Sequence, residues 1–235
     1  MSRATSLPPC FADRREAGLY LGRHLAGLGF GAAAAGEPPL VLALPRGGVP
    51  VAFEVARILE GRLDILLVRK IGAPGYPELA LGAVVEGTAA GAPPHTVAND
   101  DAWTRRALDS GAFDAERGRQ LDEISRRQQR YRAGTPAPAM AGRTVIVVDD
   151  GVATGATMRA ALEGVRRAGA KQVVAAVPVA SQEGLSSLRA AADQVVCLNV
   201  PASFGAVGTF YLDFRQTTEE EVMALLRQCG CGRPA

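Results

Sequence analysis

Hydrophobic residues recur along the chain in two kinds of spacing, and each kind predicts a type of regular structure. Short runs of consecutive apolar residues are typical of strands buried within a parallel sheet. Longer stretches with apolar residues three or four positions apart are typical of helices that pack along one face. These patterns predict strands over 40–44, 64–68, 145–148, 172–180 and 194–199, and helices over 13–28, 51–59, 158–168, 182–191 and 218–227.

The middle of the chain departs from this alternation of strand and helix. Residues 81–86 and 95–98 predict a hairpin around a tip of glycine, alanine and proline, and polar helices follow over 101–108 and 114–132. The alternation on either side predicts a sheet of parallel strands. We therefore expect one α/β domain over 1–235, a doubly wound, mostly parallel sheet with helices on both faces. Its parts are a core (1–80 and 142–200), a mixed β-hairpin and helical insert with a flexible loop (72–141), and a C-terminal hood and helix (201–235).

Composition narrows the class of protein without naming a function. The chain has 235 residues, of which 48% are hydrophobic and 21% charged, which suits one large globular domain. A net charge of +2 gives no general attraction to nucleic acid or membranes, and no apolar run approaches the length of about 20 residues that spans a bilayer. The cysteines Cys10, Cys197, Cys229 and Cys231 lack the spacing of a metal site. We expect a reduced, cytoplasmic protein with no membrane partner.

Candidate chemistry begins where the strand over 145–148 ends. Asp149 and Asp150 come first, and a loop of glycine, alanine and threonine then leads into a helix. Carboxylates at this edge of a sheet suit sugar hydroxyls or a hydrated cation, whereas backbone N–H groups at a helix N-terminus suit a phosphate. A P-loop is excluded because Gly151 and Gly155 are one residue too close and Ala156 stands where a lysine is needed. A dinucleotide fingerprint is excluded because the acids precede the glycines. The pattern predicts a ribose 5-phosphate pocket.

A second anion loop follows the strand over 40–44. Arg46 supplies a forked cation, and Gly47 and Gly48 let the backbone approach a ligand closely. The strand over 64–68 is followed by Arg69 and Lys70, adjacent cations that repel each other unless an anion lies between them. Two phosphate loops on one sheet edge predict a substrate that is phosphorylated at both ends.

The loop over 149–157 resembles the phosphoribosyl-diphosphate (PRPP) motif of type I phosphoribosyltransferases: apolar residues, two acids, variable positions and Thr-Gly-Ala-Thr. The resemblance implies that the acids bind the ribose hydroxyls and, through these or water, Mg²⁺. It also implies a non-proline cis peptide within 46–48 and a mobile flap over 73–78. The implied catalytic residues are Asp149, Asp150, Arg46 and Lys70. The residues implied to bind pyrophosphate are Arg46, Gly47, Gly48, Arg69 and Lys70. The residues implied to bind the 5-phosphate are Ala153, Thr154, Gly155, Ala156 and Thr157.

The aromatic segment over 204–214 resembles the hood of the 6-oxopurine enzymes of this family. The match is incomplete, because the spacing from Gly208 to Asp213 is one residue longer and no lysine follows the strand over 172–180. Ala153 also stands where the oxopurine enzymes carry an acid. The acceptor therefore stays open, with a purine-like base among the candidates. The hood residues implied to lie near it are Phe204, Val207, Phe210, Tyr211 and Asp213.

The resemblance implies Mg²⁺-dependent transfer of ribose 5-phosphate from PRPP to a nitrogenous acceptor, with release of pyrophosphate, by a homodimer that acts in nucleotide metabolism. The alternative is a regulator of weak activity that senses PRPP or nucleotides. Under that alternative, the arginine-rich helix over 114–132 would bind RNA. Acids on the same helix offer a simpler interpretation, a solvated face of balanced charge.

Overall fold

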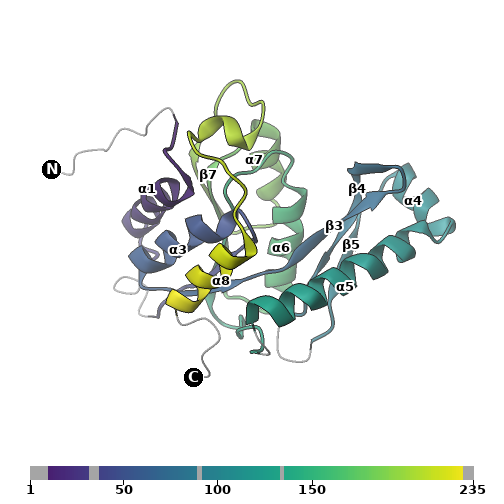
Figure 1. Ribbon diagram of the computed structural model, residues 1–235, viewed down its shortest axis with the longest axis horizontal. Helices are drawn as coiled ribbons and strands as arrows, with labels where there is room; N and C mark the ends of the chain where they lie inside the picture. Colours follow the sequence, from purple (N-terminus) through teal and green to yellow (C-terminus); the bar gives the residue numbers. More distant parts are fainter. Residues whose placement is uncertain (1–9, 32–36, 89–91, 133–134, 230–235) are drawn as a thin grey trace.

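Five parallel strands form the centre of the molecule and lie in the order β2–β1–β6–β7–β8. Nearly all of their residues are apolar, because helices bury both faces of the sheet. The computed structural model describes residues 10–31, 37–88, 92–132 and 135–229 (Figure 1). The strands are β1 (Leu40–Ala43), β2 (Arg62–Ile65), β6 (Thr144–Val148), β7 (Gln172–Val179) and β8 (Gln194–Asn199).

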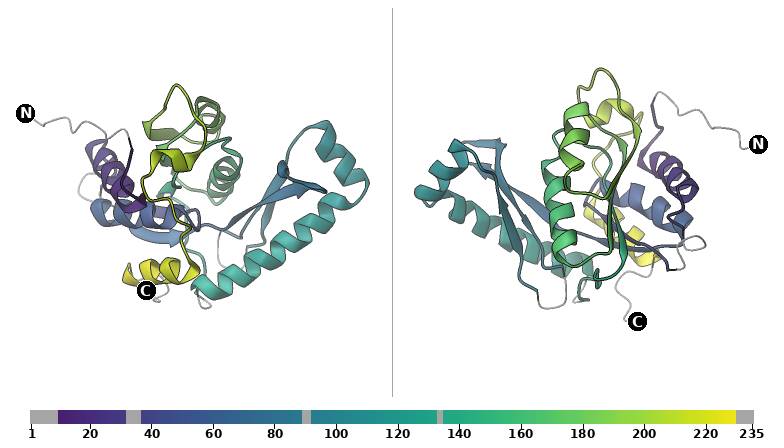
Figure 2. Two further views of the ribbon diagram at one scale, coloured as in Figure 1. Left: turned by 45° about the horizontal axis from the view of Figure 1, so that its top comes forward. Right: turned by 180° about the vertical axis from the view of Figure 1, so that it is seen from behind.

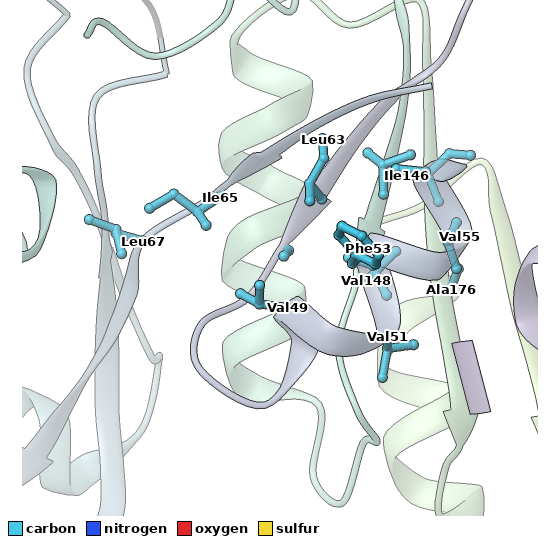
Figure 3. Packing of buried hydrophobic residues seen from close by; sticks show 14 of the residues in the cluster. Val49, Val51, Phe53, Val55, Leu63, Ile65, Leu67, Ile146, Val148 and Ala176 are labelled. Carbon is cyan, nitrogen blue, oxygen red and sulfur yellow. The ribbon is translucent and has the colours of Figure 1, made fainter. Parts of the chain in front are cut away.

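Helices cover both faces of this sheet, so the doubly wound α/β fold expected from the sequence is confirmed (Figure 1). Successive residues of β6 point to opposite faces: Ile146 packs with α3, and Val147 packs with α6. Figure 3 shows side chains of α3 converging on those of β2, β6 and β7. No helix within the described ranges is long and apolar enough to cross a membrane. One face carries α1 (Arg14–Gly27), α3 (Gly48–Leu59) and α8 (Glu219–Gln228); the other carries α6 (Ala156–Arg167) and α7 (Gln182–Leu188).

Residues 68–88 and 92–132, here called the arm, project from one side of the core (Figure 2). The arm is a three-stranded sheet in the order β3–β4–β5, with two helices packed against it. The expected hairpin is confirmed, because β4 and β5 pair antiparallel with Val85 opposite His95. Its elements are β3 (Val68–Ala73), β4 (Tyr76–Val85), β5 (His95–Ala98), α4 (Ala102–Asp109) and α5 (Ala112–Arg132).

Two expectations about the start of the arm are corrected by the structure. The strand expected over 64–68 is divided between two sheets, since β2 ends at Ile65 and Val68 begins β3. The apolar run continues through the junction because Leu66 and Leu67 are buried in different clusters, on opposite sides of the chain. The expected flap contains a tight turn between β3 and β4, with Gly75 at a φ of 76°. It is therefore part of a hairpin, and the mobility that the resemblance implies for it stays a prediction.

A buried ionic cluster joins the arm to the core. Arg132, at the end of α5, is only 4% exposed. Its Nη1 donates to Glu86 Oε2 at 2.6 Å, its Nε to Asp64 Oδ1 at 3.1 Å and its Nη2 to the Ile65 carbonyl at 2.6 Å. Glu86 also accepts a hydrogen bond from the Leu67 amide at 2.8 Å. Because Asp64 belongs to β2 and Glu86 follows β4, this cluster ties the parallel sheet to the root of the arm.

Helices α1 and α3 pack closely enough that their contact depends on glycine. A Cβ at Gly18 would lie 2.6 Å from the Val51 carbonyl oxygen and 3.0 Å from the Glu54 Cβ. A Cβ at Gly22 would lie 2.9 Å from a terminal carbon of Ile58. This close contact matters for the site described below, because it fixes the N-terminus of α1 beside the first turn of α3.

Replacing Gly18 with alanine is expected to lower the free energy of unfolding by about 1–3 kcal/mol, because the backbones of the two helices must separate. Gly27→Ala is the matched control, since a Cβ at Gly27 meets no atom within 4 Å. That control should be neutral or slightly stabilising, because alanine is the better helix former. Denaturant unfolding of both variants measures the difference. Equal midpoints would contradict the inferred close contact.

Candidate functional site

The order of the parallel strands changes direction between β1 and β6, and the candidate residues meet there. Open α/β sheets bind ligands at such a switch point, beyond the carboxyl ends of the strands. The Leu44 amide donates to the Val148 carbonyl at 2.9 Å, which brings the loops after the two strands side by side. The sequence could predict this location because each loop directly follows an apolar run.

The loop after β1 lies against the two acids. A Cβ at Gly47 would lie 2.1 Å from Asp150 Oδ2, and a Cβ at Gly48 would lie 2.7 Å from the Val148 carbonyl oxygen. Glycine is therefore required at both positions by the close approach of the second loop. The peptide bond between Pro45 and Arg46 is cis. The expected cis bond within 46–48 is thus corrected by one position.

Asp149 and Asp150 form a pair of partly buried carboxyl groups at the centre of the site. Oδ1 of Asp149 accepts a hydrogen bond from the Asp150 amide at 2.9 Å. Burial and the charge of Asp150 raise the pKa of Asp149 well above its usual range. Burial also raises the pKa of Asp150, although a hydrogen bond from Arg14 acts in the opposite direction. Two acids held in this way favour hydroxyl donors or a cation as ligands.

The loop expected to hold a phosphate runs directly from these acids into α6. Gly155 has a φ of 81° and is the N-cap residue of α6, with no side chain capping the helix. Ala153, Thr154 and Thr157 are exposed, whereas Gly155 is buried. The open N–H groups and positive end of a helix at this point suit an anion. The loop has the form that the sequence predicts for it.

The support of this loop comes from α7, which the sequence did not indicate. The Ser181 hydroxyl donates to the Ala153 carbonyl, and Ser187 Oγ donates to the Thr154 carbonyl at 3.2 Å. A Cβ at Gly184 would lie 2.5 Å from the Ala153 carbonyl oxygen. These contacts support the loop on the side of α7, and the opposite side of the loop stays exposed. A serine in a helix carries no pattern by which this role could be recognised.

The cations expected to bind pyrophosphate are not all brought together. Arg46 lies on the loop beside the acids, where its carbonyl accepts a hydrogen bond from the Val49 amide at 3.2 Å, and its side chain makes no hydrogen bond or ion pair with the residues that the structure describes. Arg69 and Lys70 lie on opposite faces of β3, since their partners Val84 and Ala83 belong to different hydrophobic clusters. Arg69 faces α5, where its Nε donates to Gln120 at 2.8 Å. Burial and the charge of Arg127 lower its pKa. The pyrophosphate role of Arg69 and Lys70 stays a prediction.

The hood over 201–213 contacts the loop that carries the two acids and supports its backbone. The rings of Phe204 and Phe210 stack with centroids 5.6 Å apart, and Val207 packs so closely on Gly151 that a Cβ there would lie 2.5 Å from it. Tyr211 is only 5% exposed, and its hydroxyl donates to the Asp150 carbonyl at 2.5 Å. Burial, with the nearby charge of Asp150, raises the pKa of Tyr211. Tyr211 therefore supports the backbone of Asp150, and its expected role near the acceptor stays a prediction.

Asp213, the last of the expected hood residues, is paired with a neighbouring arginine. Arg215 donates to its two carboxylate oxygens at 2.9 and 2.6 Å. These bonds lower the pKa of Asp213 to about 2. The Asp213 amide also donates to the Ala12 carbonyl at 2.9 Å, which ties the hood to the segment before α1. Asp213 is thus a fixed anion at the edge of the hood.

A residue missed by the sequence reasoning, Arg14, contacts the acids directly. Arg14 Nε donates to Asp150 Oδ2 at 2.8 Å, from the first turn of α1. The two residues are far apart in sequence, and a single arginine at the start of a helix gives no signal of such a contact. The contact between Arg14 and the Asp150 carboxylate is therefore visible only in the folded chain.

The described part of the chain offers no ready-made metal site. No group of three or more His, Cys, Asp or Glu side chains within it is placed to hold an ion. The three cysteines in that part, Cys10, Cys197 and Cys229, are free, and Cys231 lies outside the described residues. A metal ion at Asp149 and Asp150 would therefore take further ligands from a substrate or from water.

The arginines of α5 are compensated by carboxylates. Some pairs lie within the helix and others reach α8, where Glu219 pairs with two arginines. This pattern favours the interpretation of a balanced, solvated face over a basic surface for RNA. The pairs are Arg117 with Asp114, Arg119 with Glu116, Arg126 with Glu123 and Glu219, Arg127 with Glu123, Arg130 with Glu219 and Glu220, and Arg132 with Asp64 and Glu86.

Comparison with known proteins agrees with this geometry. A family model described as the phosphoribosyl transferase domain matches residues 16–215. The chain is 46% identical over 216 residues to proteins of Mycobacterium tuberculosis strains CDC 1551 and H37Rv that carry provisional phosphoribosyl transferase names. The match covers 92% of this chain and 46% of those proteins, so the chain spans about half the length of the curated relatives it matches.

A solved structure extends the likeness to three dimensions. The crystal structure of TT1426 from Thermus thermophilus has 50% sequence identity and a TM-score of 0.77. The match covers 93% of this chain and 98% of that chain. The two acids, the glycine loop beside them and the loop that leads into α6 thus lie on a chain that matches phosphoribosyl transferase relatives in sequence and TT1426 in both sequence and fold. This chain belongs to the type I phosphoribosyltransferase family.

Proposed function

We propose that this protein transfers ribose 5-phosphate from PRPP to a nitrogenous acceptor and releases pyrophosphate, as a step of nucleotide metabolism. The observation that carries the proposal is the close approach of Gly47 to Asp150, where a Cβ would lie 2.1 Å from Oδ2. It brings a glycine loop that carries Arg46 against acids that lead directly into a phosphate loop. A sugar with a phosphate group at each end suits this arrangement.

Each part of the substrate has a matching group in the site. The 5-phosphate suits the backbone of 154–157 and the positive end of α6. The ribose hydroxyls suit Asp149 and Asp150, which accept hydrogen bonds when ionised. The pyrophosphate suits Arg46 and the backbone of Gly47, beside the N-terminus of α3. The three groups follow one another along the sheet edge in the order in which they occur in PRPP.

In the proposed reaction, the bond between ribose C1 and a pyrophosphate oxygen breaks and its electron pair leaves with pyrophosphate. The acceptor nitrogen forms the new bond to C1 and loses a proton. Arg46 would stabilise the negative charge that develops on the leaving group. The remaining groups would hold the two ends of the donor, so that most of the rate enhancement comes from positioning and electrostatics.

The acids also fit the Mg²⁺ that the family implies. Mg²⁺ prefers oxygen ligands, keeps several waters and is usually held by one or two carboxylates together with substrate phosphates. Asp149 and Asp150 supply such carboxylates. Burial raises the pKa of both, as does the charge of Asp150 for Asp149, so a bound cation would stabilise their ionised forms. When bound, Mg²⁺ would lower the charge on the pyrophosphate.

An acceptor screen tests the proposal. Purified protein, PRPP and Mg²⁺ are combined with purine, pyrimidine and small amine acceptors, and pyrophosphate release is measured. Arg46→Ala is expected to lower kcat/KM for PRPP about a hundredfold, since it removes one preorganised donor to the leaving group. Arg62→Ala is the matched control, because Arg62 is exposed at the opposite end of the strands. Equal rates for Arg46→Ala and the original protein would contradict the assignment.

The same screen separates the enzyme from a regulator. Calorimetric binding of PRPP without pyrophosphate release from any acceptor would indicate a PRPP sensor in place of a transferase. RNA affinity that falls steeply with salt would extend that result to an RNA-binding regulator. The paired arginines of α5 lead us to expect no such affinity.

A further inference from the structure

Arg14 is held in one orientation by contacts on several sides. Its Nε donates to Asp150 Oδ2 at 2.8 Å, and its Nη1 donates to the Arg215 carbonyl at 2.8 Å. The guanidinium carbon lies 3.9 Å from the centroid of the Phe214 ring. The Arg14 side chain is only 11% exposed and that of Asp150 15%, so their ion pair is largely shielded from solvent. An arginine held in this way has little freedom to leave its carboxylate.

The N-terminus of α1 is brought to the site by a ladder of backbone hydrogen bonds. The Phe11 amide donates to the Phe210 carbonyl at 2.9 Å, and the Leu212 amide donates back to the Phe11 carbonyl at 2.8 Å. These bonds join the segment before α1 to the hood. The position of Arg14 therefore depends on the hood, and the hood and Asp150 share one contact network.

Asp150 is fixed at both its side chain and its backbone. Arg14 binds the carboxylate, Tyr211 binds the carbonyl oxygen, and Gly47 leaves room for Oδ2 against the first loop. Within the described ranges, Arg14 is the residue that forms an ion pair with Asp150, whose side chain is 15% exposed. Oδ2 is therefore occupied, and Oδ1 is the oxygen of this carboxylate that stays available for a ligand.

The neighbouring arginine provides a contrast. Arg15 makes an ion pair of similar length, 3.0 Å, but its partner is Glu54 on α3 and its side chain is 59% exposed. Both arginines line a cleft of 480 Å³ between α1, α8 and the segment after the hood. Only Arg14 reaches through to an acid of the site. The contact with Asp150 is thus particular to Arg14 and does not follow from a basic start of the helix.

We propose that Arg14 is a positioning residue of this site: it occupies one oxygen of Asp150, holds the carboxylate against Gly47, and so directs the other oxygen to a ribose hydroxyl. The proposal rests on the proposed transferase function for the identity of the ribose. Its structural part, that Arg14 sets the orientation of Asp150, stands on the contacts alone. Because the same guanidinium bonds the Arg215 carbonyl, Arg14 also links Asp150 to the segment directly after the hood.

The first test measures PRPP binding by calorimetry and PRPP kinetics in a double-mutant cycle. Arg14→Gln is expected to raise the Kd and the KM for PRPP about tenfold or more, with a smaller effect on kcat. In the Asp150→Asn background, Arg14→Gln should change the Kd less than twofold, because the residue acts through the lost carboxylate.

Arg14→Lys should recover part of the affinity, since an ammonium can replace one of the two hydrogen bonds. Arg15→Gln, the matched control, should bind PRPP as the original protein does. Independent, multiplicative effects of Arg14→Gln and Asp150→Asn on the Kd would overturn the proposal.

A second test requires no substrate, so it examines the role of Arg14 independently of the transferase function. Crystal structures of the ligand-free protein and of Arg14→Gln are compared at Asp150, with Arg14→Lys as the replacement if the glutamine variant does not fold. We expect the Asp150 carboxylate to leave its place beside Gly47 while the bond from Tyr211 to the backbone remains. An unchanged carboxylate would overturn the role of Arg14, whether or not pyrophosphate is released. A protein that neither binds nor consumes PRPP would refute the transferase function, and the comparison would still decide what Arg14 does to Asp150.

Discussion

Asp149→Asn is expected to make the ligand-free protein more stable and, at the same time, to remove most of its activity. Asp149 is a partly buried acid beside a second acid, and both burial and Asp150 raise its pKa. Keeping it ionised at neutral pH therefore opposes folding. Asparagine keeps the shape of the side chain and removes the charge. We expect a gain of about 1–2 kcal/mol in the free energy of unfolding, as is common when an active-site constraint is relieved.

The pH dependence of this gain identifies its cause. Since the pKa of Asp149 is higher in the folded chain than in the unfolded one, the folded chain binds the proton more tightly. The contribution of Asp149 to the free energy of unfolding must then fall as the pH rises from the unfolded value of 3.8 through the raised folded value. The advantage of Asp149→Asn should be largest at neutral pH and shrink toward zero in acid.

Thermal unfolding across pH, combined with pyrophosphate release, measures both halves of the prediction. Loss of the carboxylate should lower kcat/KM for PRPP about 10²–10³-fold, because it removes a preorganised charge from the reacting centre. Asp122→Asn serves as the control, since Asp122 is an exposed acid on α5. Curves of stability against pH that run parallel for Asp149→Asn and the original protein would show that Asp149 is not a destabilising charge.

Arg132→Met is expected to destabilise the protein by about 3–5 kcal/mol, because it leaves buried carboxylates without their cation. Glu86 is 0% exposed and Asp64 is 3% exposed, so neither can be compensated by solvent. Arg130→Met is the matched control on the same helix. Arg130 is 41% exposed and pairs with Glu219 and Glu220 at the surface, where an ion pair contributes about 0–1 kcal/mol.

Urea unfolding followed by circular dichroism distinguishes these two arginines. A second variant, Arg132→Met with Glu86→Gln, should recover part of the loss, because it removes one of the uncompensated charges. Similar midpoints for Arg130→Met and Arg132→Met would mean that the buried cluster contributes no more than a surface pair. The test bears on the arm, since Arg132 ties α5 to β2 and to the end of β4.

The parts of the site that the sequence predicted are those in which the chemistry is contiguous. Asp149 and Asp150, the loop to Thr157 and the loop at Arg46 each directly follow an apolar strand, so the motif and its place on the sheet could be inferred together. Arg14 could not be found in this way, because its contact with Asp150 is made by the path of the whole chain. A local pattern contains no information about such a contact.

Two other differences have local physical causes. The aromatic spacing of the hood indicates rings near the site but cannot tell a buried ring from an exposed one, so the sequence does not show that Tyr211 is buried and supports the Asp150 backbone. The apolar run through Leu66 and Leu67 hides the point at which the chain leaves the parallel sheet for the arm. In both cases, hydrophobicity reports burial without saying against which element the side chain is buried.

The arm looks like a separate limb in Figure 2, yet its interior is continuous with that of the core. Ile71, Val84, Phe113 and Ile124 of the arm belong to the same hydrophobic cluster as Val55 of α3. Heat or denaturant cannot expose one part of a contiguous cluster without weakening the rest, so arm and core form one cooperative unit. The arm therefore shares the melting transition of the core. Its root cannot be exchanged as a module, whereas substitutions of exposed side chains such as Tyr76 and Trp103 leave the shared cluster intact.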